Sequence, residues 1–238
     1  MTAAVIDAQA VGEFLDKAQP WLTEAVLADV GRSLESRARQ APRLMDRWTA
    51  LWDLAPVGRR ISPEERASWA PHLQEWLADL RDGDAERVLA RLDETAERPG
   101  WLVDWATFWL HVRDPANPWW ARWVFRPDHQ TGALLLVVDD ALLVGRGTLT
   151  ATYQEIQRLA EFLAAVLAST GRLRSVPEPH RVTVALASVY AVYLFTMAAW
   201  RMTDEFTEVL PPFPVVVKTL LGLTRWEGTR LGGQSEAH

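Results

Sequence analysis

Acidic residues placed close together are the first candidates for chemistry in this chain of 238 residues. Asp139 and Asp140 are adjacent, and two neighbouring carboxylates can bind a divalent cation or act as acid and base. Glu205 and Glu208 lie three positions apart, which places them on one face of a helix. Turns favour aspartate, and carboxylates are mostly exposed to water. We therefore interpret the first pair as a turn and the second as a solvated helix end, and we expect no metal site at either.

Asp104 is an acid within an aromatic stretch that runs from Trp101 to Trp109. His111 follows seven positions later, so a helix would place both side chains on one face. In apolar surroundings such a pair could form a small polar site, and an acid that faces water or pairs with an arginine is the simpler alternative. Aromatic residues of an apolar helix further along the chain could complete the lining. The ligand-binding residues predicted by this hypothesis are Asp104, Tyr190, Tyr193 and Trp200.

Tryptophans are concentrated in the same region, since the chain has 13 and six of them lie within residues 101–123. Trp101, Trp105 and Trp109 recur at intervals of four and form a stripe on one side of a helix. Such a stripe can be a core seam, a face that stacks a ligand or bases, or a surface that binds a partner protein. The partner surface predicted from this cluster consists of Arg113, Trp119, Trp120, Arg122 and Trp123.

Motifs that identify common enzyme classes are absent from the sequence. It contains no GxxxxGK(S/T), HExxH, GxSxG or GxGxxG pattern, and no Glu-x-x-His pair for a helical di-iron site. Cysteine is absent, which excludes disulfides, thiolate metal sites and a cysteine nucleophile. The net charge of −6 argues against broad nucleic-acid binding, although a local basic patch is compatible with it. We predict no catalytic residue, and the sequence leaves the cofactor unknown.

Helices are the elements that must position these residues. The first 114 residues read as a series of amphipathic helices. One of them, starting near Pro20, would place Trp21 on its apolar side. Ser62 and Pro63, with two glutamates after them, are a strong helix start, and Asp84 can cap the helix that follows. A further amphipathic helix is predicted from about residue 150.

Residues 119–148 differ from this helical pattern. Short runs rich in Trp, Phe, Val and Leu are separated by the sequence PDHQTG and by the aspartate pair. These features predict a three-stranded antiparallel meander or a hairpin, and a buried helix through residues 133–144 is the alternative. We predict a single helical domain of residues 1–238, in which the segment 115–148 is the candidate seam.

The apolar run from Val182 to Trp200 carries no charge, and an arginine flanks it on each side. A run of this length is either the buried central helix of a helical domain or a membrane span. Polar residues and alanines make it a weak span, so we favour the core helix, and a surface for oligomer contact is the third alternative. If the helix forms the core, aspartate in place of Val189 should unfold the protein, because a charge would be buried without a partner.

Together these patterns predict a mainly α protein, with a small antiparallel β hairpin or meander near residues 119–148 and a central buried apolar helix near 181–203. The absence of catalytic motifs and the tryptophan–arginine cluster favour a non-catalytic, cytosolic protein that binds a partner protein or associates with itself. A helical pocket for an apolar small molecule, with or without catalysis, is the first alternative. A protein anchored in a membrane by residues 182–200 is the second. Nucleic acid is the partner least compatible with the net charge.

Overall fold

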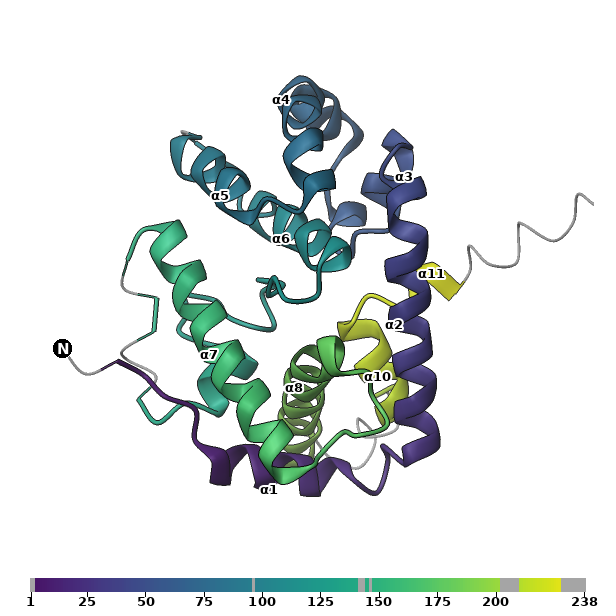
Figure 1. The fold of residues 1–238 in the computed structure, drawn as a ribbon, viewed down its shortest axis with the longest axis vertical. Coiled ribbons are helices and arrows are strands. Elements are labelled where there is room, and N and C mark those ends of the chain that lie inside the picture. Colours follow the sequence, from purple (N-terminus) through teal and green to yellow (C-terminus); the bar gives the residue numbers. More distant parts are fainter. Residues whose placement is uncertain (1–2, 96, 141–143, 146, 202–209, 228–238) are drawn as a thin grey trace, which may run out of the picture. The chain divides into compact units, whose positions relative to one another are not determined.

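The computed structural model describes residues 3–95, 97–140, 144–145, 147–201 and 210–227, and most of these residues are helical (Figure 1). The α-helices are α1 (Ala8–Ala18), α2 (Glu24–Leu44), α3 (Trp48–Asp53), α4 (Pro63–Asp82), α5 (Ala85–Glu94), α6 (Leu102–Arg113), α7 (Leu149–Thr170), α8 (Arg181–Arg201), α10 (Phe213–Leu220) and α11 (Thr224–Glu227). Three 3₁₀-helices accompany them, η1 (Gly58–Arg60), η2 (Ala133–Leu136) and η4 (Glu178–His180). The prediction of a mainly α protein is confirmed.

Local capping signals determine where α4 begins and ends. The Ser62 side chain accepts a hydrogen bond from the backbone N–H of Glu65 at 3.2 Å, and Pro63 occupies the first turn, where a missing N–H has no cost. Gly83 ends the helix with a φ of 74°, a conformation that glycine adopts without strain. Asp84 then caps α5 by accepting a hydrogen bond from the next turn, as the sequence predicts.

Contacts among the residues divide the chain into two compact units. Unit 1 comprises Met1–Arg32, Arg122–Gly145 and Arg158–Leu221, and unit 2 comprises Ser33–Ala121, Arg146–Gln157 and Gly222–His238. Two of the crossings between the units fall within the segment 115–148 that the sequence marks as a candidate seam. The single-domain interpretation stays a prediction.

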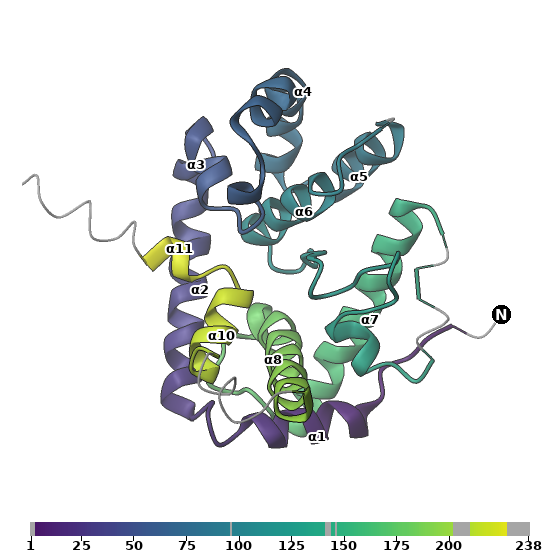
Figure 2. The same cartoon turned by 180° about the vertical axis from the view of Figure 1, so that it is seen from behind.

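Helix α8 is the central element of unit 1, where it contacts α1, α10, η2 and η4 (Figure 2). Its first half is buried, including Val184, Val189 and Val192, whereas Thr196 and Ala199 near its end are exposed. The helix predicted near 181–203 is therefore present, and residues 202 and 203 lie outside the described part. Within that part, one helical stretch, Glu178–Ala199, could cross a membrane by length and composition, a test that the core helix of a soluble protein also passes.

Helix α6 forms the centre of unit 2, with α4 and α5 packed against it. Trp105 and Trp109 are fully buried, and both indole N–H groups donate to the backbone carbonyl of Leu51, at 2.9 and 3.1 Å. Leu51 lies in the last turn of α3, where carbonyl groups have no donor within the helix. The tryptophan stripe predicted from the sequence thus caps a neighbouring helix from inside the core.

The β hairpin or meander predicted for residues 119–148 is not confirmed, because the described residues of this segment contain no strand. The run predicted as the second strand begins as the 3₁₀-helix η2. Before it, an isolated bridge between Arg126 and Thr131 closes a turn, and Gly132, at a φ of 128°, lies so close to the Val124 carbonyl that a Cβ would be 2.5 Å from it. After this bridge the consecutive N–H groups of Ala133 and Leu134 donate to the Trp123 and Val124 carbonyls, whereas antiparallel strands pair through alternate residues, so the bridge does not extend into a ladder. Residues 141–143 and 146 lie outside the described part.

The remainder of this segment ties down the N-terminus of unit 1. Val138 forms an isolated bridge with Ile6, and the Asp139 carboxylate accepts hydrogen bonds from the backbone N–H groups of Val5 and Asp140, both at 2.9 Å. One carboxylate of the Asp139–Asp140 pair is thus occupied in fixing two backbone segments.

Candidate functional site

Three of the residues predicted to bind a ligand or a partner form an internal network in unit 2. The Trp119 indole donates to the Asp104 carboxylate at 2.8 Å, and the Trp120 backbone N–H donates to the Thr107 hydroxyl at 3.0 Å. Trp119 and Trp120 are only 3% and 8% exposed. These bonds hold the segment after α6 against the helix itself, and the two tryptophans predicted as a partner surface lie in the packed interior.

Other predicted residues near α6 have similar structural contacts. His111 is buried, and its Nδ1 donates to the Asn117 carbonyl at 2.9 Å. Arg113 is exposed and donates from Nε to the Arg81 carbonyl at 2.7 Å. Arg122 is exposed and belongs to unit 1. Two of the polar residues predicted near Asp104, His111 and Arg113, thus bond to backbone carbonyl groups.

Residues predicted for two different sites meet in unit 1. The ring centroids of Tyr190 and Tyr193 are 5.8 Å apart, and those of Trp123 and Tyr190 are 6.2 Å apart. Burial raises the pKa of Tyr190, since the phenolate is poorly solvated there. The side chain of Trp200 lies outside the described part, and Asp104 belongs to the other unit. Of the four residues predicted to bind a ligand, Tyr190 and Tyr193 thus lie side by side.

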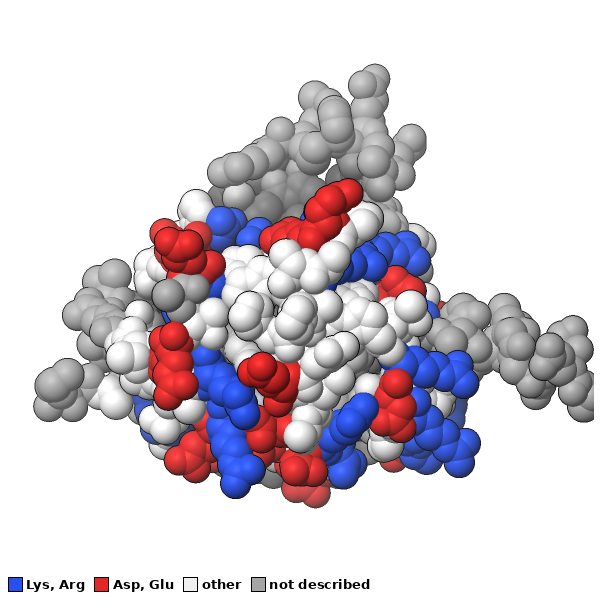
Figure 3. Space-filling view, turned by 90° about the horizontal axis from the view of Figure 1, so that it is seen from above, with Lys and Arg blue, Asp and Glu red and all other residues white. Residues whose placement is uncertain are grey.

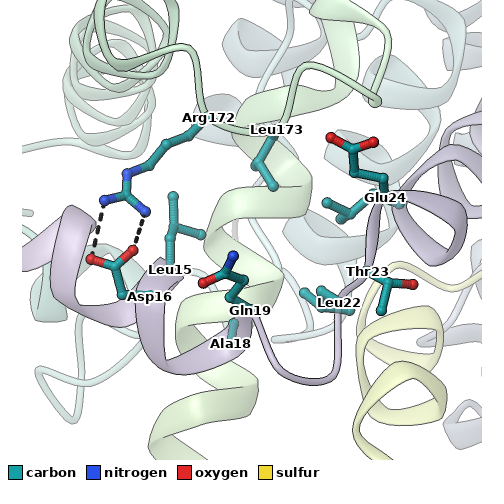
Figure 4. Close-up of a pocket in the computed structure, with 10 residues that line it drawn as sticks. Leu15, Asp16, Ala18, Gln19, Leu22, Thr23, Glu24, Arg172 and Leu173 are labelled. Carbon is teal, nitrogen blue, oxygen red and sulfur yellow. Dashed lines mark hydrogen bonds and ion pairs between the residues drawn. The ribbon is translucent and has the colours of Figure 1, made fainter.

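A hollow of about 360 Å³ lies in unit 1 between the end of α1, the start of α2 and the loop after α7 (Figure 4). We call it the α1–α2 hollow. Its apolar lining comes from Leu15, Ala18, Leu22, Leu27 and Leu173, and its polar lining from Asp16, Gln19, Thr23, Glu24 and Arg172.

Two charged groups close one side of the α1–α2 hollow. Arg172 forms a bidentate pair with the Asp16 carboxylate, at 2.5 and 3.1 Å (Figure 4). This hydrogen-bonded pair lowers the pKa of Asp16 and raises that of Arg172. Glu24 and Thr23 lie on the other side of the hollow in the same view. The hollow therefore has a leucine-rich interior and a rim that carries both signs of charge.

The loop that supplies Arg172 and Leu173 is held in an unusual conformation. Leu173 has a φ of 57°, which is rare for a residue with a Cβ and costs free energy. The Leu173 carbonyl accepts a hydrogen bond from Val176 N–H at 2.9 Å, and the Pro177 ring lies so close to Gly31 that a Cβ there would be 2.6 Å away. Packing against α2 thus compensates for the strain at Leu173.

Beside the hollow, the connector between α1 and α2 carries an exposed aromatic residue. Trp21 is 45% exposed, and its ring stacks on Phe213 of α10 with centroids 5.0 Å apart. Phe195 of α8 completes the group at 5.2 Å from Phe213. The sequence placed Trp21 within a helix, but α2 begins only at Glu24. The connector therefore displays the ring, while its neighbour Leu22 lines the hollow.

A metal-binding arrangement is not found in the part of the chain that the structure describes. No group of three or more His, Asp or Glu residues in those ranges could hold a metal ion. Glu205 and Glu208, whose spacing suggested a shared helix face, lie outside them.

Comparisons of the chain with protein-family models, curated proteins and solved structures found no match. The function has to be inferred from the residues themselves.

Proposed function

We propose that this protein is a non-catalytic interaction protein, and that the α1–α2 hollow and the adjacent Trp21 bind an amphipathic segment of a partner protein. The observation that carries this proposal is the half-exposed Trp21 on a connector that also lines a leucine-rich hollow. Tryptophan is enriched among the residues that dominate binding energy at protein interfaces. A large exposed ring held in place by Phe213 loses little conformational entropy on binding.

The size and lining of the hollow favour an inserted side chain. At about 360 Å³ it is near the lower end of the volumes of small-molecule pockets, which are roughly 300–1,000 Å³. Leu15, Leu22 and Leu173 offer apolar contacts to one or two side chains of a partner. An apolar anchor in a pocket with a polar rim is typical of protein interfaces.

The rim charge favours a partner with a basic residue next to the apolar anchor. Arg172 neutralises Asp16, so Glu24 is the remaining charge at the opening. Glu24 is exposed in the first turn of α2, so its carboxylate is accessible at the opening. A lysine or arginine of the partner would then pair with Glu24 while the anchor enters the hollow.

Site-specific photo-crosslinking in the native host tests this proposal. A benzophenone amino acid replaces Trp21 in one variant and Phe162 in the control, because both side chains are aromatic, 45% exposed and part of unit 1. We expect position 21 alone to capture a defined protein, and a peptide spanning the crosslinked site to bind the purified chain. Equal capture at both positions, no capture at position 21, or crosslinks only between copies of this chain would contradict the proposal.

A blocked hollow provides the second arm of the test. Gln19→Phe places a ring at the rim, and Gln9→Phe makes the same exchange at an exposed position of α1 outside the hollow. We expect Gln19→Phe to weaken peptide binding by about tenfold or more, as the loss of one buried anchor would. Gln9→Phe should bind normally. Equal affinities of the two variants would show that the peptide binds elsewhere.

A further inference from the structure

Charge does not mark a ligand site on the face that α4 presents. Acidic and basic side chains alternate there around a broad uncharged area, and neither sign dominates among the described residues in that view (Figure 3). Side chains that react chemically are more informative. The chain has no cysteine and three tyrosines, Tyr153, Tyr190 and Tyr193. Phenol rings undergo one-electron oxidation, so the placement of these rings decides whether two of them can react with each other.

Two of the three tyrosines lie together on α8. Tyr190 and Tyr193 are three positions apart, which places them on one face of the helix. Their ring centroids are 5.8 Å apart, and the ring planes are tilted by 32°. Both side chains are partly exposed, and neither hydroxyl is hydrogen-bonded to another residue in the described ranges of the chain. A small oxidant can therefore reach both rings, and no hydrogen bond holds them apart.

Tyr153 differs from this pair in each respect. It is fully buried, and its hydroxyl donates to the Pro118 carbonyl at 3.0 Å. Burial also raises the pKa of Tyr153, so the loss of the phenol proton that accompanies oxidation is opposed there. Tyr153 belongs to unit 2, whereas Tyr190 and Tyr193 belong to unit 1. The pair on α8 is therefore the place where two tyrosines of one chain can couple.

An indole ring lies next to the pair. The ring centroids of Trp123 and Tyr190 are 6.2 Å apart, and Trp123 is partly exposed. At neutral pH an oxidised indole takes an electron from a neighbouring phenol, because the phenol releases its proton and the resulting phenoxyl radical is the more stable product. Oxidation that begins at Trp123 therefore moves to Tyr190, so the arrangement collects oxidation at the tyrosine pair.

We propose that Tyr190 and Tyr193 are a site of oxidative modification, at which a one-electron oxidant formed from a peroxide couples the two rings to dityrosine. Each phenol loses one electron to the oxidant and its O–H proton to water, which leaves two phenoxyl radicals. A carbon–carbon bond then forms between the ring carbons ortho to the two oxygens, and each ortho proton moves to the phenol oxygen. The pair loses two hydrogen atoms in total, and hydrogen peroxide is reduced to two water molecules. This inference is independent of the partner binding proposed for the α1–α2 hollow.

Photo-oxidation of the full chain at low protein concentration tests this proposal. A photoexcited ruthenium complex supplies the one-electron oxidant, with persulfate as the final electron acceptor, and size exclusion isolates the monomer. Trypsin cleaves after Arg181 and Arg201, so both tyrosines of the pair remain in one peptide. We expect the blue fluorescence of dityrosine in the monomer, and this peptide should be lighter by two hydrogen atoms. Oxygen addition alone, or dityrosine formed only between chains, would overturn the proposal.

Two variants separate the geometry of the pair from the number of tyrosines. Tyr193→Phe keeps the ring and removes one phenol. Combining it with Thr196→Tyr restores the number of tyrosines at an exposed position of α8. Position 196 lies on a different side of the helix from Tyr190, because the two are six positions apart. Both variants should fold by circular dichroism and lose the dityrosine signal of the monomer. If the relocated tyrosine couples as well as Tyr193 does, the pairing on one helix face does not direct the reaction.

Discussion

The Leu51 carbonyl and its two indole donors allow a direct test of how unit 2 is held together. Trp105 and Trp109 are fully buried, one turn apart on α6, and donate to the same oxygen at 2.9 and 3.1 Å. In Trp105→Phe or Trp109→Phe, the other indole still satisfies this carbonyl. In the double variant the carbonyl is left buried with neither indole donor. The two substitutions should therefore be strongly non-additive.

The expected coupling follows from the cost of an unpaired buried polar group. Each single variant loses one hydrogen bond, a net of about 0.5–1.5 kcal/mol, together with the packing of the larger ring. The packing losses occur in both singles and largely cancel in a double-mutant cycle. The double variant additionally leaves the Leu51 carbonyl desolvated, which costs about 1–3 kcal/mol. We expect a coupling free energy of that size.

Urea unfolding of the four proteins, followed by circular dichroism, gives the four free energies of unfolding. A control cycle pairs Trp109→Phe with Trp119→Phe, because both rings contact Phe108 but the Trp119 indole donates to Asp104 instead. The control pair shares a packing neighbour but no hydrogen-bond acceptor, so its coupling measures the packing contribution alone and should be smaller than that of Trp105 with Trp109. If the Trp105–Trp109 coupling is no larger than that of the control, the shared carbonyl does not stabilise the fold as argued.

Three further predictions concern stability. Gly58→Ala should destabilise unit 2 by more than about 4 kcal/mol in thermal unfolding, because the added Cβ would overlap the Trp52 carbonyl. Gly12→Ala in α1 is the control. Its Cβ would have 3.7 Å of clearance, so this substitution should stabilise the protein by about 0.5–1 kcal/mol. Val189→Asp should prevent folding, because it buries a charge without a partner. Thr196→Asp lies on the exposed part of α8 and should fold, and circular dichroism with size exclusion distinguishes the two outcomes. A folded Val189→Asp variant would contradict the placement of α8 in the core. Burial lowers the pKa of Arg37 to about 9, so above that pH the unfolded chain binds more protons and the free energy of unfolding should rise with pH. The difference between the protein and its Arg37→Met variant should show this rise between about pH 8 and 10.5, and parallel curves would contradict it.

Helix boundaries set by neighbouring residues were predictable from the sequence. Ser62 and Asp84 act through hydrogen bonds to the turn that follows them, and Gly83 through its own backbone conformation. The apolar run around Val189 was likewise readable as a helix, because its length exceeds that of ordinary strands.

The segment 119–148 was not predictable from its apolar runs. Such runs favour strands and buried helices equally, and the outcome depends on how closely the chain can return on itself. Here the approach of Gly132 to Val124 and the pairing of Val138 with Ile6 decide the conformation. Val138 and Ile6 are distant in the sequence, and the approach of Gly132 to Val124 depends on a single backbone angle. A hydrophobic pattern shows neither contact.

The candidate site escaped prediction for a related reason. Asp16 and Arg172, which close the α1–α2 hollow, are 156 positions apart, and nothing in the local sequence of either indicates the other. Trp21 was assigned to a helix face because its spacing fits one, and its exposure depends on α2 starting at Glu24. The number of tryptophans around α6 suggested a binding surface, yet most of these side chains are buried in the core.

The interleaving of the two units has a consequence for how the chain folds as it is synthesised. The largest piece of unit 2, Ser33–Ala121, is continuous, so α3, α4, α5 and α6 can pack soon after they leave the ribosome. Unit 1 can pack only later, because the main contacts of α1 are with α8. The ion pair of Asp16 with Arg172 likewise requires more than 150 further residues to be synthesised. Until then the apolar side of α1 is exposed on the nascent chain, where chaperones can bind it.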